Sequence, residues 1–332
     1  MRPLPAAIQG RAPGTGRAVA LSLGLAGGLL AVVVAASGMS LEALWSGVRR
    51  VPLGLFAAVA LAQGAIVALA AVKWRLILRA NGGRGLPLAE ALGATTMGVL
   101  AGQVMPIQLV TPALRAWIAR PHGIPAARAI GTSLLEQVFE ILVLGAMAAA
   151  GLLAHAAGLS LAQAGAVALL VAAAMTVFVA PGLRLAQRAT GAVAARFGGP
   201  FAGLAEGFAR AGQLPRRLMF QLTGLSLLRY VLLAGLNVVL LIQLAPQADP
   251  LVMLAAFPLV QLLSALPVVP AGLGLVEMTW SGVLLTQGLG PAEVAGAALA
   301  LRLVSTAGFV VLVPVLLAPM LAGLHGRGRG RR

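Results

Sequence analysis

The chain has 332 residues, of which 60% are hydrophobic and 10% charged, and its mean hydropathy is +0.98. A soluble globule of this composition could not cover its surface with polar side chains, so we predict an integral membrane protein without a soluble catalytic domain. The net charge of +16 comes mainly from arginines beside apolar segments, where membrane helices carry them, and this placement argues against nucleic-acid binding. The chain has no cysteine, which excludes disulfides and cysteine nucleophiles.

Six apolar segments are long enough, at roughly 20 residues, to cross a hydrocarbon core of about 30 Å as helices. They lie near residues 18–36, 51–72, 130–153, 160–181, 218–244 and 294–318. The first follows several arginines, as the apolar part of a signal peptide would. It is long for a signal peptide, and we expect an uncleaved helix.

Two further apolar regions, residues 86–112 and 251–288, are interrupted by Pro and Gly in "VMPIQLVTP" and "LPVVPAGLG". Non-helical backbone at membrane depth is tolerated only where protein or a water-filled cavity satisfies its polar groups. We therefore expect each region to form a broken, re-entrant segment that lines a cavity. The predicted fold class is all-α and polytopic, with about six full transmembrane helices plus two broken segments, and with eight spans as the alternative.

Positive charge orients the chain, because the cytoplasmic loops of membrane proteins are enriched in Lys and Arg. The connections between the second and third clear spans and between the fourth and fifth are rich in arginine, whereas residues 154–159 and 245–250 contain neither Lys nor Arg. We expect the arginine-rich connections and both termini to be cytoplasmic. The chain is then one membrane domain, residues 1–326, with a basic cytoplasmic tail, residues 327–332.

The sequence also contains a candidate internal repeat. The segment "IPAARAIGTSLLEQV" from Ile124 aligns without gaps on "GPAEVAGAALALRLV" from Gly290. Each segment follows a broken region, and the charge rule places the starts of the two helices on opposite sides of the membrane. This predicts an inverted-topology repeat of about 86–181 and 250–318, the plan of many secondary transporters. Chance similarity between Ala- and Leu-rich segments is the alternative.

Few ionisable side chains lie inside the apolar regions, and each is costly there, so these are the candidate functional residues. Glu136 and Glu140 are four residues apart on one helix face. Arg115 follows the first broken region, Glu277 ends the second, and Arg302 aligns with Glu136 in the repeat. These side chains could contact a lipid headgroup, relay protons or form ion pairs that hold helices together. We expect Glu136 and Arg302 to pair near the midplane.

Motifs for catalysis are nearly absent. We find no P-loop, no metal-ligand spacing and no convincing acid/base set, so we expect neither an enzyme nor a bound cofactor or metal. The single lysine, Lys73, is expected to flank a helix with its amine at the membrane surface. Tryptophans near the expected span ends are predicted to be interfacial anchors, namely Trp45, Trp74, Trp117 and Trp280.

Five segments together resemble the flippase-like membrane region of the lysylphosphatidylglycerol synthase family and its stand-alone members. They are "KWRLILRA", "GQVMPIQLVTPALRAW", "TSLLEQVFEIL", "LPVVPAGLGLVE" and "ALALRLV", within residues 50–318. The most specific piece is P-x-x-P-x-G-L-G-x-x-E, where the family pattern falls on Pro267, Pro270, Gly272, Gly274 and Glu277. The Pro and Gly residues would unwind the backbone at depth, and Glu277 would supply charge where a headgroup passes.

The resemblance implies movement of a lipid between the leaflets of the inner (cytoplasmic) membrane of a bacterium. The cargo would be an anionic or aminoacylated phospholipid or an isoprenoid-linked lipid. The alternative is an accessory subunit that scaffolds a lipid-modifying enzyme, for example in a hopanoid or glycolipid pathway. The implied partners are membrane lipids, with a lipid-modifying enzyme and a second copy of the chain left open.

The sequence departs from the family in three respects. Thr111 and Pro112 stand where the family usually has Gly followed by Glu or Asp, so an acidic headgroup ligand is missing. Gln137 stands where many members have Arg. The aminoacyltransferase domain of the full synthases is absent, and lysyl transfer is therefore not expected from this chain.

Overall fold

The computed structural model describes residues 45–329 with several gaps. The gaps are residues 46, 83–84, 104, 161, 164, 175, 178–187, 189–190, 193–194, 196–213 and 265–273. The described part is helical and contains no strand. This confirms the predicted class, an all-α polytopic membrane protein.

Four of the described helices are long and apolar enough to cross a membrane. They are α3 (Leu53–Ala80), α6 (Ala126–Ala157), α9 (Arg216–Leu244) and α12 (Pro291–Arg329). The predicted span at 18–36 lies outside the described residues. The predicted span at 160–181 is described only in part, and it contains a shorter apolar helix, Gly165–Ala174.

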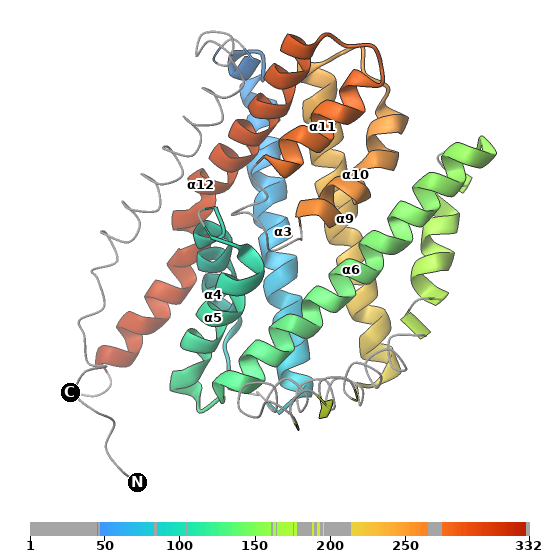
Figure 1. The fold of residues 1–332 in the computed structure, drawn as a ribbon. Helices are drawn as coiled ribbons and strands as arrows, with labels where there is room; N and C mark the ends of the chain where they lie inside the picture. The colour runs from blue at the N-terminus through green and yellow to red at the C-terminus, as the bar shows by residue number, and fades with distance from the viewer. Residues whose placement is uncertain are drawn as a thin grey trace.

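The first broken region forms two short helices, α4 (Leu88–Ala101) and α5 (Ile107–Ala119). At 1.5 Å per residue each is about 20 Å long, too short to cross the hydrocarbon core alone. The two helices pack against each other as a hairpin. In Figure 1 this hairpin begins and ends at the end of the bundle where α3 ends and α6 begins. A short 3-10 helix, η2 (Arg120–His122), and Gly123 then lead into α6.

The second broken region forms α10 (Pro250–Ser264) and α11 (Leu275–Leu285), which also pack against each other. It begins and ends at the opposite end of the bundle, where α9 ends and α12 begins (Figure 1). Between its two helices, residues 265–273 lie outside the described part of the chain. Three of the predicted site residues, Pro267, Pro270 and Gly272, fall within that gap.

The described helices therefore follow the order long, short, short, long twice. The first series is α3, α4, α5 and α6, and the second is α9, α10, α11 and α12. The two short-helix hairpins point into the bundle from opposite ends (Figure 1). This is the order that an inverted-topology repeat requires.

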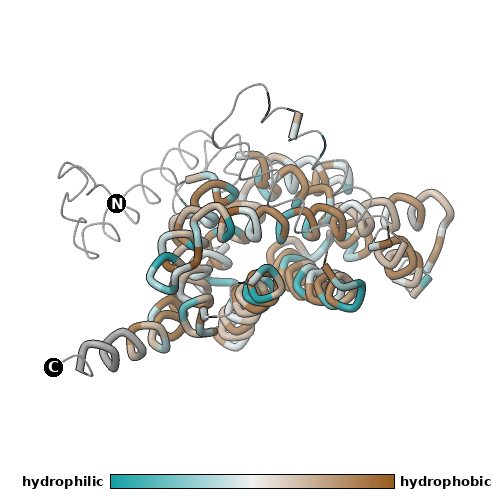
Figure 2. Tube along the Cα trace, turned by 90° about the horizontal axis from the view of Figure 1, so that it is seen from below, coloured by the Kyte–Doolittle hydropathy of each residue, from teal (hydrophilic) through white to brown (hydrophobic). Residues whose placement is uncertain are grey.

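Close helix crossings depend on small residues. A Cβ atom added to Gly308 of α12 would lie 3.3 Å from the backbone nitrogen of Ala60 in α3, and one added to Gly151 of α6 would lie 3.1 Å from the carbonyl oxygen of Ala255 in α10. Membrane helices associate mainly by such close packing, because lipid tails are as apolar as the side chains between the helices. The view from below in Figure 2 shows the described helices clustered side by side and coloured mostly as hydrophobic.

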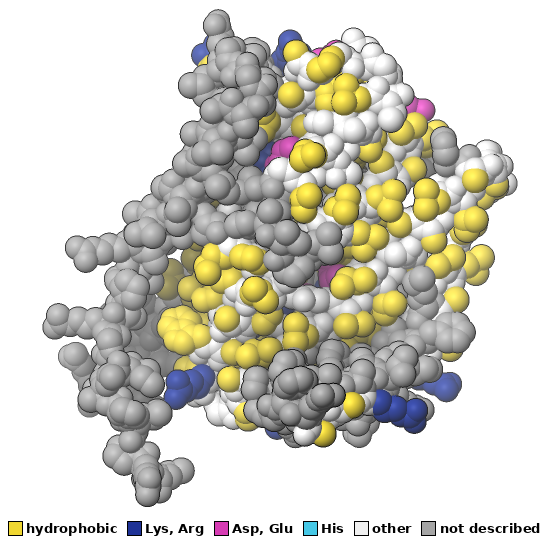
Figure 3. Space-filling model, in the orientation of Figure 1, with side chains coloured by type: hydrophobic (Ala, Val, Ile, Leu, Met, Phe, Trp, Pro, Cys, Tyr) yellow, Lys and Arg dark blue, Asp and Glu magenta, His cyan; other side chains and the backbone are white. Residues whose placement is uncertain are grey.

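The surface agrees with a membrane environment. Figure 3 shows hydrophobic side chains over much of the visible face, with Lys and Arg side chains gathered near its lower and upper margins. Trp45 and Trp117 are 55% and 63% exposed. The prediction that Trp74 and Trp280 are interfacial anchors was wrong, because both are fully buried. The indole of Trp74 donates a hydrogen bond to Thr132 Oγ1 at 3.1 Å, so its polar atom is satisfied within the bundle.

Candidate functional site

Five charged side chains meet in the interior of the bundle. Two carboxylates of α6, Glu136 and Glu140, face Lys73 of α3, Arg115 of α5 and Arg229 of α9. We call these five residues the buried charge cluster. Lys73 is fully buried and Glu136, Glu140 and Arg115 are nearly so. Three of the sequence-predicted site residues, Arg115, Glu136 and Glu140, thus lie in one cluster that joins four helices.

Glu136 lies between two cations. It forms an ion pair with Arg115, and its Oε1 lies 3.8 Å from Lys73 Nζ. Arg115 also donates a hydrogen bond to Thr95 Oγ1 of α4 at 3.1 Å, and its guanidinium lies over the ring of Trp74, 4.8 Å from the centroid. The arginine therefore links α5 to α3, α4 and α6.

Glu140 also contacts two cations, and it shares Lys73 with Glu136. It forms ion pairs with Lys73 and with Arg229. Lys73 Nζ also donates a hydrogen bond to Ser226 Oγ of α9 at 2.9 Å. The prediction of a surface amine for Lys73 was wrong, since helices α6 and α9 both pack against this face of α3 and supply its polar partners. The composition held one signal that this position is unusual, because the chain has a single lysine and 23 arginines.

A second buried ion pair lies in the other half of the chain. Arg302 Nη1 of α12 lies 2.9 Å from Glu277 Oε1 of α11. The other oxygen of Glu277 accepts a hydrogen bond from the backbone N–H of Gly274 at 2.8 Å, which caps the first turn of α11. Gly274 has φ +82°, a conformation that other residues adopt only with strain, so the glycine is required where the chain leaves the broken segment. Glu277 thus fixes both the start of α11 and its contact with α12.

The predicted pair between Glu136 and Arg302 was wrong. Glu136 pairs with Arg115 and Lys73, whereas Arg302 pairs with Glu277. In both halves an ion pair joins the second short helix to the long helix that follows it, but the signs are reversed: the short helix carries the cation in the first half and the carboxylate in the second. Each charge is satisfied by a neighbouring helix of its own half, and the sequence alignment could not show this.

Polar side chains connect the inner ends of the two hairpins. Gln108, near the start of α5, donates a hydrogen bond to the carbonyl of Ser264 at the end of α10, at 3.3 Å. Gln137 of α6 donates to the carbonyl of Gln108, also at 3.3 Å. These three residues form a polar seam between the hairpins. Nothing in the sequence marks Gln108 or Ser264 as site residues except their position beside the Pro- and Gly-broken segments.

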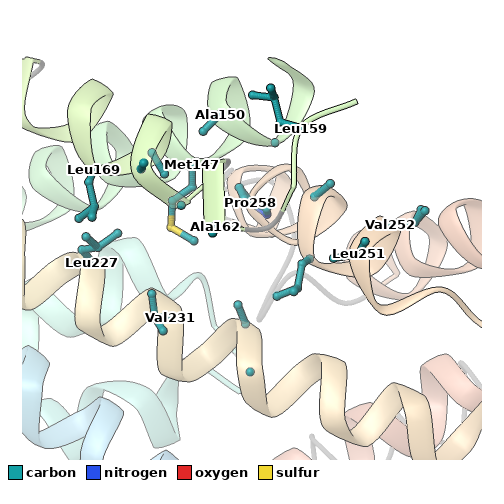
Figure 4. A pocket seen from close by; sticks show the side chains of 18 of the residues that line it. Met147, Ala150, Leu159, Ala162, Leu169, Leu227, Val231, Leu251, Val252 and Pro258 are labelled. Atoms are coloured by element: carbon teal, nitrogen blue, oxygen red, sulfur yellow. The ribbon is translucent and has the colours of Figure 1, made fainter. Parts of the chain in front are cut away.

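An apolar groove of about 980 Å³ lies between α6, α9, α10 and residues 158–169. Figure 4 shows side chains of Met147, Leu227, Val231, Leu251 and Pro258 along its walls. Small residues such as Ala150 and Gly151 leave the space open. A hydrocarbon chain is the kind of ligand that such walls accept. Among the described residues, no three His, Asp or Glu side chains are grouped so as to hold a metal ion.

The fold and the site define a class: a polytopic helical membrane protein with two broken hairpins inserted from opposite ends and with ionisable residues buried among its helices. The sequence profile described as "Lysylphosphatidylglycerol synthase TM region" matches residues 19–313, and the chain belongs to that family. This confirms the resemblance found in the sequence. Neither the curated proteins nor the solved structures contain a match to the chain.

Proposed function

We propose that this protein moves a lipid between the two leaflets of the membrane. The observation that carries the proposal is the meeting of two broken helical hairpins, inserted from opposite ends of the bundle, at a polar seam next to the buried charge cluster. Many secondary transporters form a polar substrate site near the membrane midplane from interrupted helices that meet there. Charges are costly inside a bilayer, and a transport role would explain why several are kept at this depth.

The parts of a lipid divide between two surfaces of the protein in this mechanism. The headgroup passes along the seam of Gln108, Gln137 and Ser264 and the charged side chains beside it. The hydrocarbon tails stay in the bilayer or in the apolar groove, because moving them into a polar path would cost about 0.8 kcal/mol for each CH₂ group. The cargo is an anionic or aminoacylated phospholipid, or an isoprenoid-linked lipid.

The protein acts in the inner membrane of a bacterium with both termini cytoplasmic, in agreement with the distribution of its arginines. It changes the position of a lipid and forms no covalent bond, so lysyl transfer belongs to another protein.

Reconstitution in liposomes tests the proposal. Short-chain fluorescent phosphatidylglycerol, lysylphosphatidylglycerol and an isoprenyl phosphate lipid are each placed in one leaflet, and the label that reaches the other leaflet is measured over time. We expect exchange above that of empty vesicles for at least one of them. Gln108→Leu, which removes the hydrogen bond from the first hairpin to Ser264 of the second, should slow the exchange, whereas Leu53→Ala, at a side chain that is 82% exposed, should not.

The alternative function is that of a membrane accessory subunit. It is favoured by one observation: Glu277 and all five members of the buried charge cluster already make ion pairs inside the protein, as purely structural charges would. Absence of exchange above empty vesicles for every lipid tested would support this function and reject lipid movement.

A further inference from the structure

The buried charge cluster carries one positive charge in excess. It contains three cations, Lys73, Arg115 and Arg229, and only two carboxylates. Among the described residues, the other side chains that contact these three cations are neutral, namely Trp74, Thr95, Ser133, Ser226 and Tyr230. A buried charge without a counter-charge is costly in a low-dielectric interior. The electrostatic free energy of the cluster therefore falls if one cation becomes neutral.

Only one member of the cluster can do so. The guanidinium groups of Arg115 and Arg229 keep their protons at any pH that a protein experiences. Protonation of Glu136 or Glu140 would raise the excess charge. Lys73 remains, since loss of one proton turns its ammonium group into a neutral amine. Arginine occupies 23 basic positions of this chain, and the single lysine lies in the cluster with the excess charge.

We propose that Lys73 is a proton-exchange site. Release of one proton from Nζ takes the cluster from a net charge of +1 to zero, and uptake reverses the change. The surroundings suit both forms. The ammonium group donates a hydrogen bond to Ser226 Oγ, forms an ion pair with Glu140 and lies 3.8 Å from Glu136 Oε1, and the neutral amine keeps two N–H donors for Ser226 and Glu140. The side chain is fully buried, so each change alters the charge of the protein interior.

The link between this site and lipid rests on the proposed function. An anionic headgroup that comes close to the cluster compensates its excess charge, so it favours the protonated form of Lys73. By thermodynamic reciprocity, protonation of Lys73 favours binding of that headgroup to the same extent. Lipid movement then takes up a proton when the headgroup arrives and releases it when the headgroup leaves.

The single lysine allows a direct test that needs no transport. Protein labelled with ¹⁵N at lysine Nζ gives one side-chain amine signal, whose chemical shift is followed against pH in detergent micelles. The control carries Lys73→Arg and Arg216→Lys, which moves the only lysine to an exposed position at the start of α9. We expect Lys73 to change from ammonium to amine at a lower pH than the control lysine. Titration at the same pH or at a higher pH would overturn the proposal.

Translocation measured in liposomes at different pH values gives the second readout. We expect the wild-type rate to change with pH and the rates of Lys73→Arg and Lys73→Met to be independent of it, since neither side chain exchanges a proton. A flat wild-type profile beside a low-pH titration of Lys73 would keep the proton site and reject its link to transport. Absence of any translocation beside the same titration would reject the proposed function alone.

Discussion

A lysine can give up its proton and an arginine cannot, and the buried charge cluster contains both kinds of cation. The packing of the four helices that meet there depends on the balance between three cations and two carboxylates. Loss of a carboxylate and loss of a cation should therefore lower stability by different amounts. Removal of a carboxylate increases the excess charge, whereas removal of a cation eliminates it.

Neutralising Glu140 should accordingly destabilise the protein more than neutralising Lys73. Glu140→Gln leaves three cations with one carboxylate, whereas Lys73→Met leaves two of each sign. Breaking a buried ion pair costs about 3 to 5 kcal/mol, and we expect Glu140→Gln to lower the free energy of unfolding by about that amount and Lys73→Met by clearly less. Denaturant titration in detergent, followed by circular dichroism, measures both.

The double variant is the control for this prediction. Lys73→Met combined with Glu140→Gln brings the excess back to a single positive charge, so it should be more stable than Glu140→Gln alone. Equal losses for the two single variants, with no recovery in the double variant, would mean that net charge does not govern the stability of the cluster.

Double-mutant cycles should separate the true ion pairs from the expected one. Arg115→Gln with Glu136→Gln, and Glu277→Gln with Arg302→Gln, should show coupling of about 0.5 to 3 kcal/mol, because each pair is in contact. Glu136→Gln with Arg302→Gln should be additive within about 0.5 kcal/mol. Thermal or denaturant unfolding of the purified variants provides the values. Strong coupling between Glu136 and Arg302 would contradict the pairing described above.

The sequence identified most charged members of the site but not their partners. A charge in an apolar segment is conspicuous, so Arg115, Glu136 and Glu140 could be found without a structure. Which charges meet depends on the rotation and depth of each helix in the bundle. An alignment of two sequence segments gives no information about either. Lys73 was missed because it is close in sequence to Arg75 and Arg79 at a helix end, where a surface lysine is the common case.

At the scale of elements, the Pro and Gly residues predicted the interruptions but not the number of helices. Each broken region was expected to be re-entrant, and each contains two short helices that pack as a hairpin. Hairpin packing requires contacts that composition does not show. In the first hairpin, a Cβ atom added to Gly98 of α4 would lie within 2.7 to 3.0 Å of the side chain of Thr111 in α5.

Gly98→Ala should therefore separate α4 from α5. The added methyl group meets the branched Thr111 side chain, and we expect a loss of about 1 to 3 kcal/mol in unfolding free energy together with slower lipid exchange. Gly145→Ala in α6 is the matched control, because nothing lies within 4 Å of its Cβ position, and it should be neutral or stabilising by up to about 1 kcal/mol. Thr111→Ala should restore part of the stability of Gly98→Ala. Equal stability of the two glycine variants would show that the hairpin tolerates the extra atom.

For the whole molecule, α6 is long and apolar enough to cross the membrane, so its two ends are expected on different sides. Composition predicted a membrane protein, because 60% hydrophobic residues leave few alternatives. The arginine distribution predicted the orientation, since the start of α6 follows an arginine-rich connection and its end has no Lys or Arg. The packing of the four long helices around the hairpins could not be predicted from the sequence. Every span is apolar on all sides, so the sequence does not show which face contacts a neighbouring helix.

Cysteine labelling tests the orientation cleanly, since the chain has no cysteine. We expect Ala127→Cys, at the start of α6, to react with a membrane-impermeant maleimide only from the cytoplasmic side, and Ala157→Cys, at its end, only from the opposite side. Residues 155–158 should thus be extracytoplasmic. Residues 196–212 lie outside the described part of the chain and are predicted to be cytoplasmic, so Ala202→Cys should behave as Ala127→Cys does. Reaction of all three from one side would reverse the predicted topology.

The depth of Lys73 in α3 has an electrical consequence. Seven residues separate it from Ala80, which is about 10 Å along a helix of roughly 40 Å, and twenty separate it from Leu53. A proton that reaches the amine from the Ala80 side has crossed about a quarter of the membrane voltage, worth about 0.6 kcal/mol at 100 mV. If Lys73 exchanges a proton as we propose, occupancy of the site depends on the membrane potential as well as on pH, and an energised cell would bias the direction of the proposed lipid movement.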